Sequence, residues 1–261
     1  MITLDQGGRG RATTRIIPAP PSIGAIAELL WIDSTRHDVG ATHHWTVVAD
    51  DAPHLIYSLL NDGRGDRHRL VVVGARRVHA RIHLGGRQLT VGVRLRPGSL
   101  PALFGVDASS LTDRATPFDS MVPPAERGAA ERFHGRSPEQ IAHELARVIA
   151  RLAGHGRPLD HRARLLETLA RQQSGDVRAI ATQFRMSDRG LRAWSSAHVG
   201  IGVRRILRIR RVHAALEIRL AQPRSTWSTI AARTGFADHS HLVRDCTALV
   251  GESPSAFLAR G

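Results

Sequence analysis

The sequence predicts an α+β fold: an N-terminal β-rich domain, then an all-α domain with two helix-turn-helix units joined by a long helix. Residues 16–125 consist of short segments rich in Val, Ile and Leu that are separated by Gly, Pro and Asp, which is typical of strands. After residue 125 the apolar residues recur at helical spacing. A sequence unit that occurs twice near the C-terminus predicts the paired helix-turn-helix motifs.

The first half contains three strand signals. Residues 44–48 and 55–60 are predicted strands, and residues 78–95 are predicted to form a hairpin around Gly85-Gly86, because alternating segments flank a two-residue glycine turn. In that hairpin Val78, Ala80, Ile82 and Leu84 would share one face. Residues 1–15 lack the apolar core of a secretory signal and are expected to be a flexible tail.

Residues 126–156 are predicted to be a helical connector. Its helix would run from Ser137 to about residue 153, since Ser137 can cap it, Pro138 suits the first turn and Gln140 can complete a capping box. The best linker candidate is residues 154–158.

The remaining residues, 157–261, are predicted to form an all-α domain of seven helices. Capping residues such as Asp160, Asp176, Ser187 and Asp238 mark where most of them begin. The expected helices cover residues 160–173, 176–184, 187–197, 203–221, 226–233 and 238–249, with a last short one from Pro254.

The repeated unit predicts two helix-turn-helix motifs, at residues 177–197 and 227–249. Each has Ile-Ala (Ile180-Ala181 and Ile230-Ala231), then a break, a capping residue, and a Leu four residues after the cap. The small Ala lets two helices approach closely, and the Leu anchors the second helix on the first. In this motif the second helix is free to enter a major groove.

Charge and spacing favour a polyanionic partner for this half. Residues 157–261 hold 18 Arg and 8 acidic residues, a net charge of +10 out of +14 for the chain. This charge is compatible with DNA, RNA or an anionic membrane as the partner. Residues 203–221 would span about 28 Å as a helix, near the roughly 34 Å between successive major grooves. The spacer arginines could contact phosphates: Arg204, Arg205, Arg208, Arg210 and Arg211.

The order of residues through the second unit is its most specific feature. Ile230-Ala231, residues 235–244 and residues 251–257 resemble the signature of the AraC/XylS-type transcription regulators. The first unit matches this family less well, because Ala193 and Ser195 stand where it usually has Arg and an aromatic residue. Residues 91–105 and 111–113 are similar to the domain of undefined ligand, cupin-like or jelly-roll-like, that accompanies some of these regulators.

The resemblance implies a sequence-specific DNA-binding regulator, an activator in the bacterial cytoplasm, with residues 16–125 as a sensor for an unknown small-molecule effector. RNA polymerase and a second copy of the chain are further candidate partners. Activation is the expected sign of regulation, and repression stays open as the alternative. The residues expected to face DNA are Asp188, Arg189, Arg192 and Ala193 in the first unit, His239, Ser240, Val243 and Arg244 in the second, and Arg204 and Arg208 on the spacer.

Other functions find less support in the residues. No apolar run is long enough to span a membrane. A single cysteine, Cys246, excludes an internal disulfide and a cysteine-based zinc site, and we expect it to be a small core residue. We expect no cofactor, and no catalytic motif such as Gly-x-Ser-x-Gly or His-Glu-x-x-His occurs. A constitutive DNA-binding protein whose β half only dimerises remains the alternative.

Two polar clusters in the first half have less specific readings. His43, His44, His79 and His83 are interpreted as solvent-facing or polar-core histidines rather than metal ligands. Asp50-Asp51 is interpreted as turn chemistry rather than a carboxylate pair.

Overall fold

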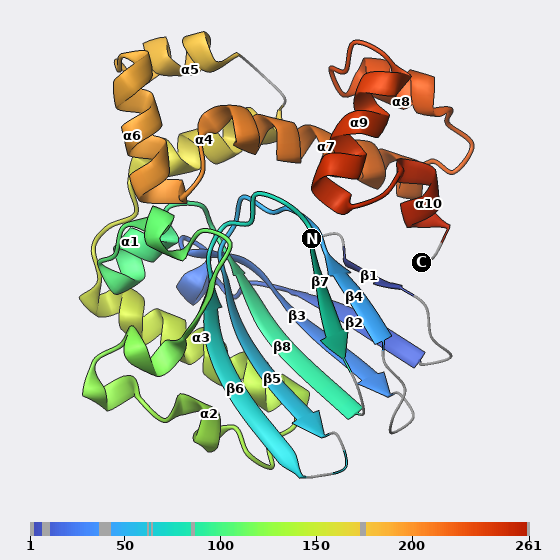
Figure 1. The fold of residues 1–261 in the computed structure, drawn as a ribbon. Helices are drawn as coiled ribbons and strands as arrows, with labels where there is room; N and C mark the ends of the chain where they lie inside the picture. Colours follow the sequence, from blue (N-terminus) through green and yellow to red (C-terminus); the bar gives the residue numbers. More distant parts are fainter. Residues whose placement is uncertain are drawn as a thin grey trace.

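The computed structural model describes residues 3–6, 11–36, 43–61, 63, 65–84, 87–172 and 176–259. A β-rich N-terminal half lies beneath a layer of C-terminal helices (Figure 1), which confirms the predicted fold class. Among the described residues, no helix is both long and apolar enough to cross a lipid bilayer.

The N-terminal half contains two antiparallel sheets. The smaller has the strand order β1–β4–β7 and comprises β1 (Thr3–Gln6), β4 (His43–Val47) and β7 (Ala80–Leu84). The larger has the order β2–β3–β8–β5–β6–β9 and comprises β2 (Arg11–Pro18), β3 (Ala27–Arg36), β8 (Arg87–Leu95), β5 (His54–Asn61), β6 (Asp66–Val73) and β9 (Ala115–Pro117). The strands predicted at residues 44–48 and 55–60 are β4 and β5.

The predicted hairpin of residues 78–95 is wrong. Strand β7 pairs with β4, whereas β8 pairs with β3 on one edge and β5 on the other. Since both edges of β8 are occupied, the segment with Gly85-Gly86, which itself lies outside the described residues, connects two sheets. Val78 and Ile82 are 47% and 42% exposed, so the apolar side expected there is open. Alternation shows which residues share a face, but it does not identify the neighbouring strand.

A long helix, α3 (Pro138–His155), covers one face of the larger sheet. Its capping box forms as predicted: Ser137 Oγ accepts from the Gln140 N–H, and Gln140 Oε1 accepts from the Ser137 N–H. Leu145 and Ile149 share a hydrophobic core with the sheet. The remaining short elements are η1 (Pro21–Ile23), α1 (Ser99–Phe104), η2 (Ala108–Leu111), η3 (Phe118–Ser120), η4 (Pro124–Glu126) and α2 (Ala129–Arg132).

All seven helices predicted for the C-terminal half are present. Asp160, Asp176, Ser187 and Asp238 each accept a hydrogen bond from a backbone N–H in the first turn, which explains where those helices begin. The helices are α4 (His161–Arg171), α5 (Val177–Gln183), α6 (Asp188–Val199), α7 (Val203–Ala221), α8 (Trp227–Arg233), α9 (His239–Val250) and α10 (Pro254–Leu258).

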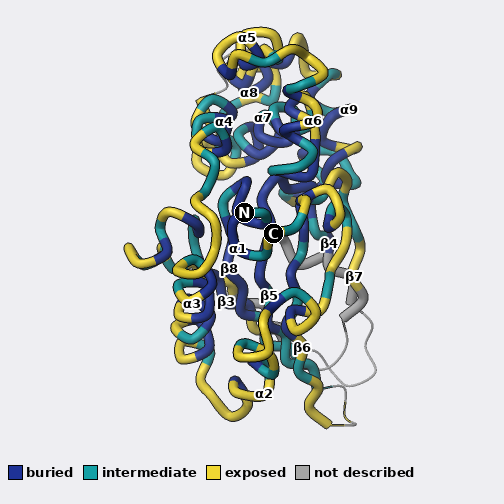
Figure 2. Tube along the Cα trace, turned by 90° about the vertical axis from the view of Figure 1, so that its left-hand side faces the viewer, coloured by how far each residue is buried: buried dark blue, intermediate teal, exposed yellow. Residues whose placement is uncertain are grey.

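The two halves pack against each other directly. Val48 and Ala49, from the loop between β4 and β5, and Ala75 belong to the same buried cluster as the core of the C-terminal helices. The Ala49 N–H donates to the Leu249 carbonyl at the end of α9, and its carbonyl accepts from His213 Nε2 on α7. Figure 2 shows buried segments on both sides of this boundary. The loop therefore joins the sheet to two helices of the other half.

Candidate nucleic-acid interface

The two helix-turn-helix units share a turn geometry as well as a sequence pattern. In the first, the Met186 N–H donates to the Ala181 carbonyl; in the second, the Phe236 N–H donates to the Ala231 carbonyl, both over 2.9 Å. A residue with positive φ follows each alanine by four positions, Arg185 (φ 53°) and Gly235 (φ 73°). This left-handed residue ends the first helix of each unit and reverses the chain towards the second.

Apolar contacts hold the second helix of each unit on the first. In the first unit, Leu191 and Ile180 belong to the same buried cluster, and the Phe184 and Trp194 rings meet edge to face with centroids 5.2 Å apart. Ser195, where the family has an aromatic residue, is fully buried, and its Oγ donates to the Ile201 carbonyl over 2.5 Å. Trp194 thus supplies aromatic bulk next to that position.

The residues expected to face DNA lie opposite these buried faces. On α6, Asp188, Arg189, Arg192 and Ala193 are all exposed. On α9 the residues His239, Ser240 and Arg244 are exposed and Val243 is half-buried. The buried side of α9 carries Leu242 and Cys246, and burial raises the pKa of the Cys246 thiol to about 12. Cys246 is therefore a core residue.

Helix α7 connects the units, which lie towards its two ends in Figure 1. Arg204 is exposed near its start. Arg208 is half-buried and pairs with Asp245 of α9, Nη2 to Oδ1 2.7 Å, so its guanidinium also holds the second unit in place. Arg210 is only 8% exposed, so the prediction that it contacts phosphates is wrong: the apolar side of α7 turns it inward, away from solvent.

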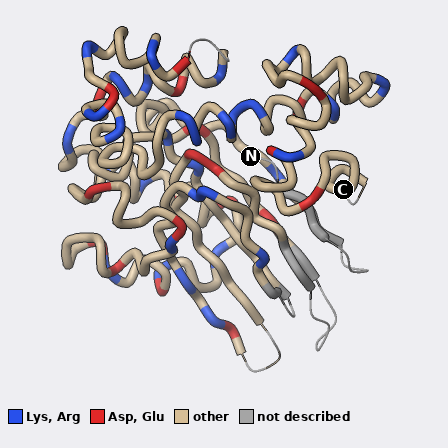
Figure 3. Tube along the Cα trace, turned by 45° about the horizontal axis from the view of Figure 1, so that its top comes forward, with Lys and Arg blue, Asp and Glu red and all other residues tan. Residues whose placement is uncertain are grey.

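A basic groove of about 830 Å³ lies along α7 between the two units. Four arginines line it, from α7 and α8: Arg204, Arg208, Arg211 and Arg233. Arg211 is held by a hydrogen bond to the Gly235 carbonyl, and its guanidinium lies 5.6 Å from the centre of the Phe236 ring. Figure 3 shows basic residues along α7 and on both units. The groove therefore presents positive charge where a phosphate backbone would cross between two major grooves.

The opposite side of α7 is tied to the N-terminal half by ion pairs. Arg210 Nε donates to Asp51 Oδ2 over 2.8 Å, and the Asp51 side chain is completely buried. Asp50 pairs with Arg94 of β8 and with His54, and its Oδ1 also accepts from the Ala52 N–H. The interpretation of Asp50-Asp51 as turn residues thus holds for the Asp50–Ala52 bond but misses both ion pairs.

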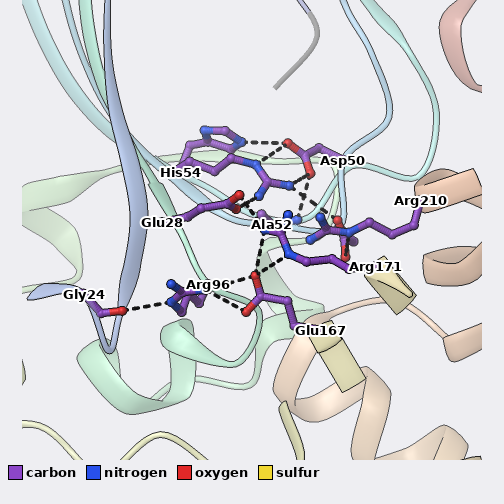
Figure 4. A network of polar contacts seen from close by, with 11 residues as sticks. Gly24, Glu28, Asp50, Ala52, His54, Arg96, Glu167, Arg171 and Arg210 are labelled. Carbon is purple, nitrogen blue, oxygen red and sulfur yellow. Dashed lines mark hydrogen bonds and ion pairs between the residues drawn. The ribbon is translucent and has the colours of Figure 1, made fainter. Parts of the chain in front are cut away.

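A second set of ion pairs reaches α4 (Figure 4). Glu28 of β3 contacts both Arg94 and Arg171, and Glu167 of α4 accepts from Arg96 over 3.0 Å. Burial opposes the ionisation of Glu28, but the charges of Arg94 and Arg171 outweigh it and lower its pKa to about 2. The network therefore stays charged at neutral pH and binds two helices of the C-terminal half to the sheet.

No metal-binding cluster of His, Cys, Asp or Glu occurs in the part of the chain that the structure describes. Of the four histidines considered, His79 contacts the C-terminal half, because its ring lies against Gly251. The side chains of His43, His44 and His83 lie outside the described residues.

Two family models match the chain. Residues 180–260 match a helix-turn-helix domain, and residues 15–117 match a domain of unknown function, DUF6597. The search of curated proteins returned no match.

Solved structures of ToxT from Vibrio cholerae align with nearly the whole chain at low identity. An apo variant is 11% identical with a TM-score of 0.45, covering 98% of this chain and 99% of that one. A second ToxT structure is 9% identical with a TM-score of 0.46, covering 96% and 98%. A third, with bound unsaturated fatty acid, is 11% identical with a TM-score of 0.45, covering 98% and 96%.

Proposed function

Because the chain carries an AraC-type helix-turn-helix domain at residues 180–260, we propose that it is a sequence-specific, DNA-binding transcription regulator. The observation that carries the proposal is the pair of units at the ends of α7, each with a polar face exposed on its second helix. The 19 residues of α7 span about 28 Å, close to the roughly 34 Å between successive major grooves. One chain can thus place α6 and α9 in adjacent turns of DNA.

The proposal assigns roles by chemistry. Arg189 and Arg192 on α6 suit guanine, because a guanidinium donates to both O6 and N7. His239, Ser240 and Arg244 on α9 can donate to bases or phosphates, while Asp188, Ala193 and Val243 complete the two faces. Arg204 and Arg208 contact the phosphates that cross the basic groove, and Arg208 does so while holding Asp245.

We assign sensing to residues 16–125 and DNA binding to residues 157–261. Ion pairs and a shared core connect the two parts, so a ligand that shifts the sheet relative to α7 would change how α6 and α9 are presented. RNA polymerase and a second copy of the chain are proposed partners, and the cytoplasm is the proposed compartment.

The test is selection of bound sequences from a random double-stranded DNA library by the full-length protein at moderate salt. We expect an enriched site with two short elements about one helical turn apart, and an affinity that falls steeply with salt because phosphate contacts release counterions. Arg192→Ala should lose preference at a few positions of that site. The control is Arg147→Ala, an exposed arginine of α3, which should select the same site as the wild type. Failure to enrich any sequence, with or without cell extract, would overturn the proposal.

A further inference from the structure

The face of the larger sheet opposite α3 collects buried polar atoms that have no hydrogen-bond partner among the described residues. They are Trp31 Nε1 and Asp33 Oδ1 on β3, His54 Nδ1 on β5, and Gln88 Oε1 on β8. The register places them on one face, since Trp31 lies opposite Gly92, Asp33 opposite Thr90, and His54 opposite Arg94. Buried polar groups are normally paired, so this concentration on one surface requires an explanation.

Trp31 and Gly92 show how this surface is built. A Cβ atom at Gly92 would lie 2.3 Å from the Cε2 and Cζ2 atoms of the Trp31 ring, so the indole lies directly over the glycine backbone. Only glycine allows the ring to rest against β8 in this way. Asp33 follows two residues along β3 and therefore stands on the same face as the indole.

Asp33 carries a charge that the described residues do not neutralise. The residue is 8% exposed, and its side chain is hydrogen-bonded to the Thr14 hydroxyl. Burial raises its pKa, because the ionised form loses hydration without gaining a cation. On this face Arg94 is already bound by Glu28 and Asp50, and Arg67 and Arg69 lie on β6, the third strand from β3 in the sheet order. The surface is therefore left with a negative group and an unused amide oxygen.

From this arrangement we propose that the face formed by Trp31, Asp33 and Gln88 binds a small organic amine in its ammonium form. The ammonium N–H groups donate to Asp33 Oδ1 and Gln88 Oε1, which belong to diagonal neighbours about 7–8 Å apart across β3 and β8. The Trp31 ring stabilises the positive charge by a cation–π contact. A carboxylate ligand is disfavoured, because Asp33 would repel it.

The site adjoins the ion pairs that hold the C-terminal helices. His54 presents its unpartnered Nδ1 on the same face, while its Nε2 lies 3.1 Å from Asp50. Asp50 in turn contacts Arg94, and the adjacent Asp51 binds Arg210 of α7. An amine on this face can thus shift the position of α7; this part of the proposal rests on the proposed regulator function, whereas amine binding does not.

The test measures amine binding to the full-length protein without DNA. Calorimetry and thermal unfolding are followed with ethanolammonium, putrescine and tetramethylammonium chlorides, with sodium chloride and sodium acetate as controls. We expect a primary amine to raise the melting temperature and to bind more tightly than tetramethylammonium, which has no N–H to donate. Neither control salt should raise the melting temperature to the same extent.

Asp33→Asn is the decisive variant. It should weaken amine binding at least tenfold while raising the melting temperature of the free protein at pH 7.5, because it removes an unpaired buried charge. The matched control, Asp119→Asn, changes an exposed aspartate and should bind the amines as the wild type does. The proposal is overturned if none of the amines stabilises the protein, or if Asp33→Asn binds them as tightly as the wild type. DNA selection by the same preparation then reports separately on the regulator function.

Discussion

The Asp51–Arg210 pair offers a direct test of how firmly the two halves are joined. Arg210→Met keeps an apolar stem of similar length on α7 but leaves the completely buried Asp51 carboxylate without its nearest cation. Removing one partner of a buried ion pair costs about 3–5 kcal/mol. We expect the lower end, about 3 kcal/mol, because Arg94 Nη2 stays 3.6 Å from Asp51 Oδ1. For a chain of this size that corresponds to a fall in Tm of roughly 6–12 °C.

Urea unfolding followed by tryptophan fluorescence measures this cost, since two of the four tryptophans lie in each half: Trp31 and Trp45, then Trp194 and Trp227. The double variant Asp51→Leu with Arg210→Met should recover most of the loss, because it removes both charges together. Arg204→Met, an exposed change on the same helix, should stay within about 0.5 kcal/mol of the wild type. A cost below about 1 kcal/mol for Arg210→Met, or a double variant as unstable as the single one, would refute the reasoning.

Three further outcomes are expected. In binding titrations against the selected site and its point variants, Arg192→Ala should lose about 1–3 kcal/mol of discrimination at one or two bases, whereas Arg204→Ala should weaken binding to all sequences alike and reduce the salt slope by about one. Burial lowers the pKa of His213, so below pH 6.5 the unfolded chain binds a proton that the folded chain excludes, and the free energy of unfolding should decline as the pH falls. Unfolding measured at several pH values should show a smaller decline for His213→Gln, because glutamine keeps a donor towards the Ala49 carbonyl but does not titrate. Iodoacetamide should modify Cys246 only in urea, as mass spectrometry would show, because its thiol is buried and stays protonated.

Local signals in the sequence were sufficient for the C-terminal half. Caps such as Ser187 and Asp238, followed by Leu at the fourth position, depend only on neighbours along one helix, and the structure has a helix at each predicted place. The same local logic predicted which faces of α6 and α9 are exposed. Strand pairing is not local, so the partners of β7 and β8 could not be derived from their alternation.

The ion pairs between the two halves also could not be predicted from the sequence. Asp51 and Arg210 are 159 positions apart, and neither lies in a sequence motif from which the other could be predicted as its partner. Because the sequence of α7 is rich in arginine, Arg210 was predicted to be a surface charge like its neighbours. A signal existed in its neighbours: Ile206, Ile209 and Val212 mark the buried side of α7, and Arg210 follows Ile209 directly.

The loop between β4 and β5 has a practical consequence for engineering this chain. Its Ala49 backbone is hydrogen-bonded to the end of α9 and to His213 of α7, so part of the surface of the C-terminal half is completed by a segment from the other half. A chimera that grafts a foreign sensor onto residues 157–261 would leave those groups unmatched unless it also carried the loop. Exchange of the sensor domain should therefore succeed only when residues 48–53 are kept together with the C-terminal helices that they cover.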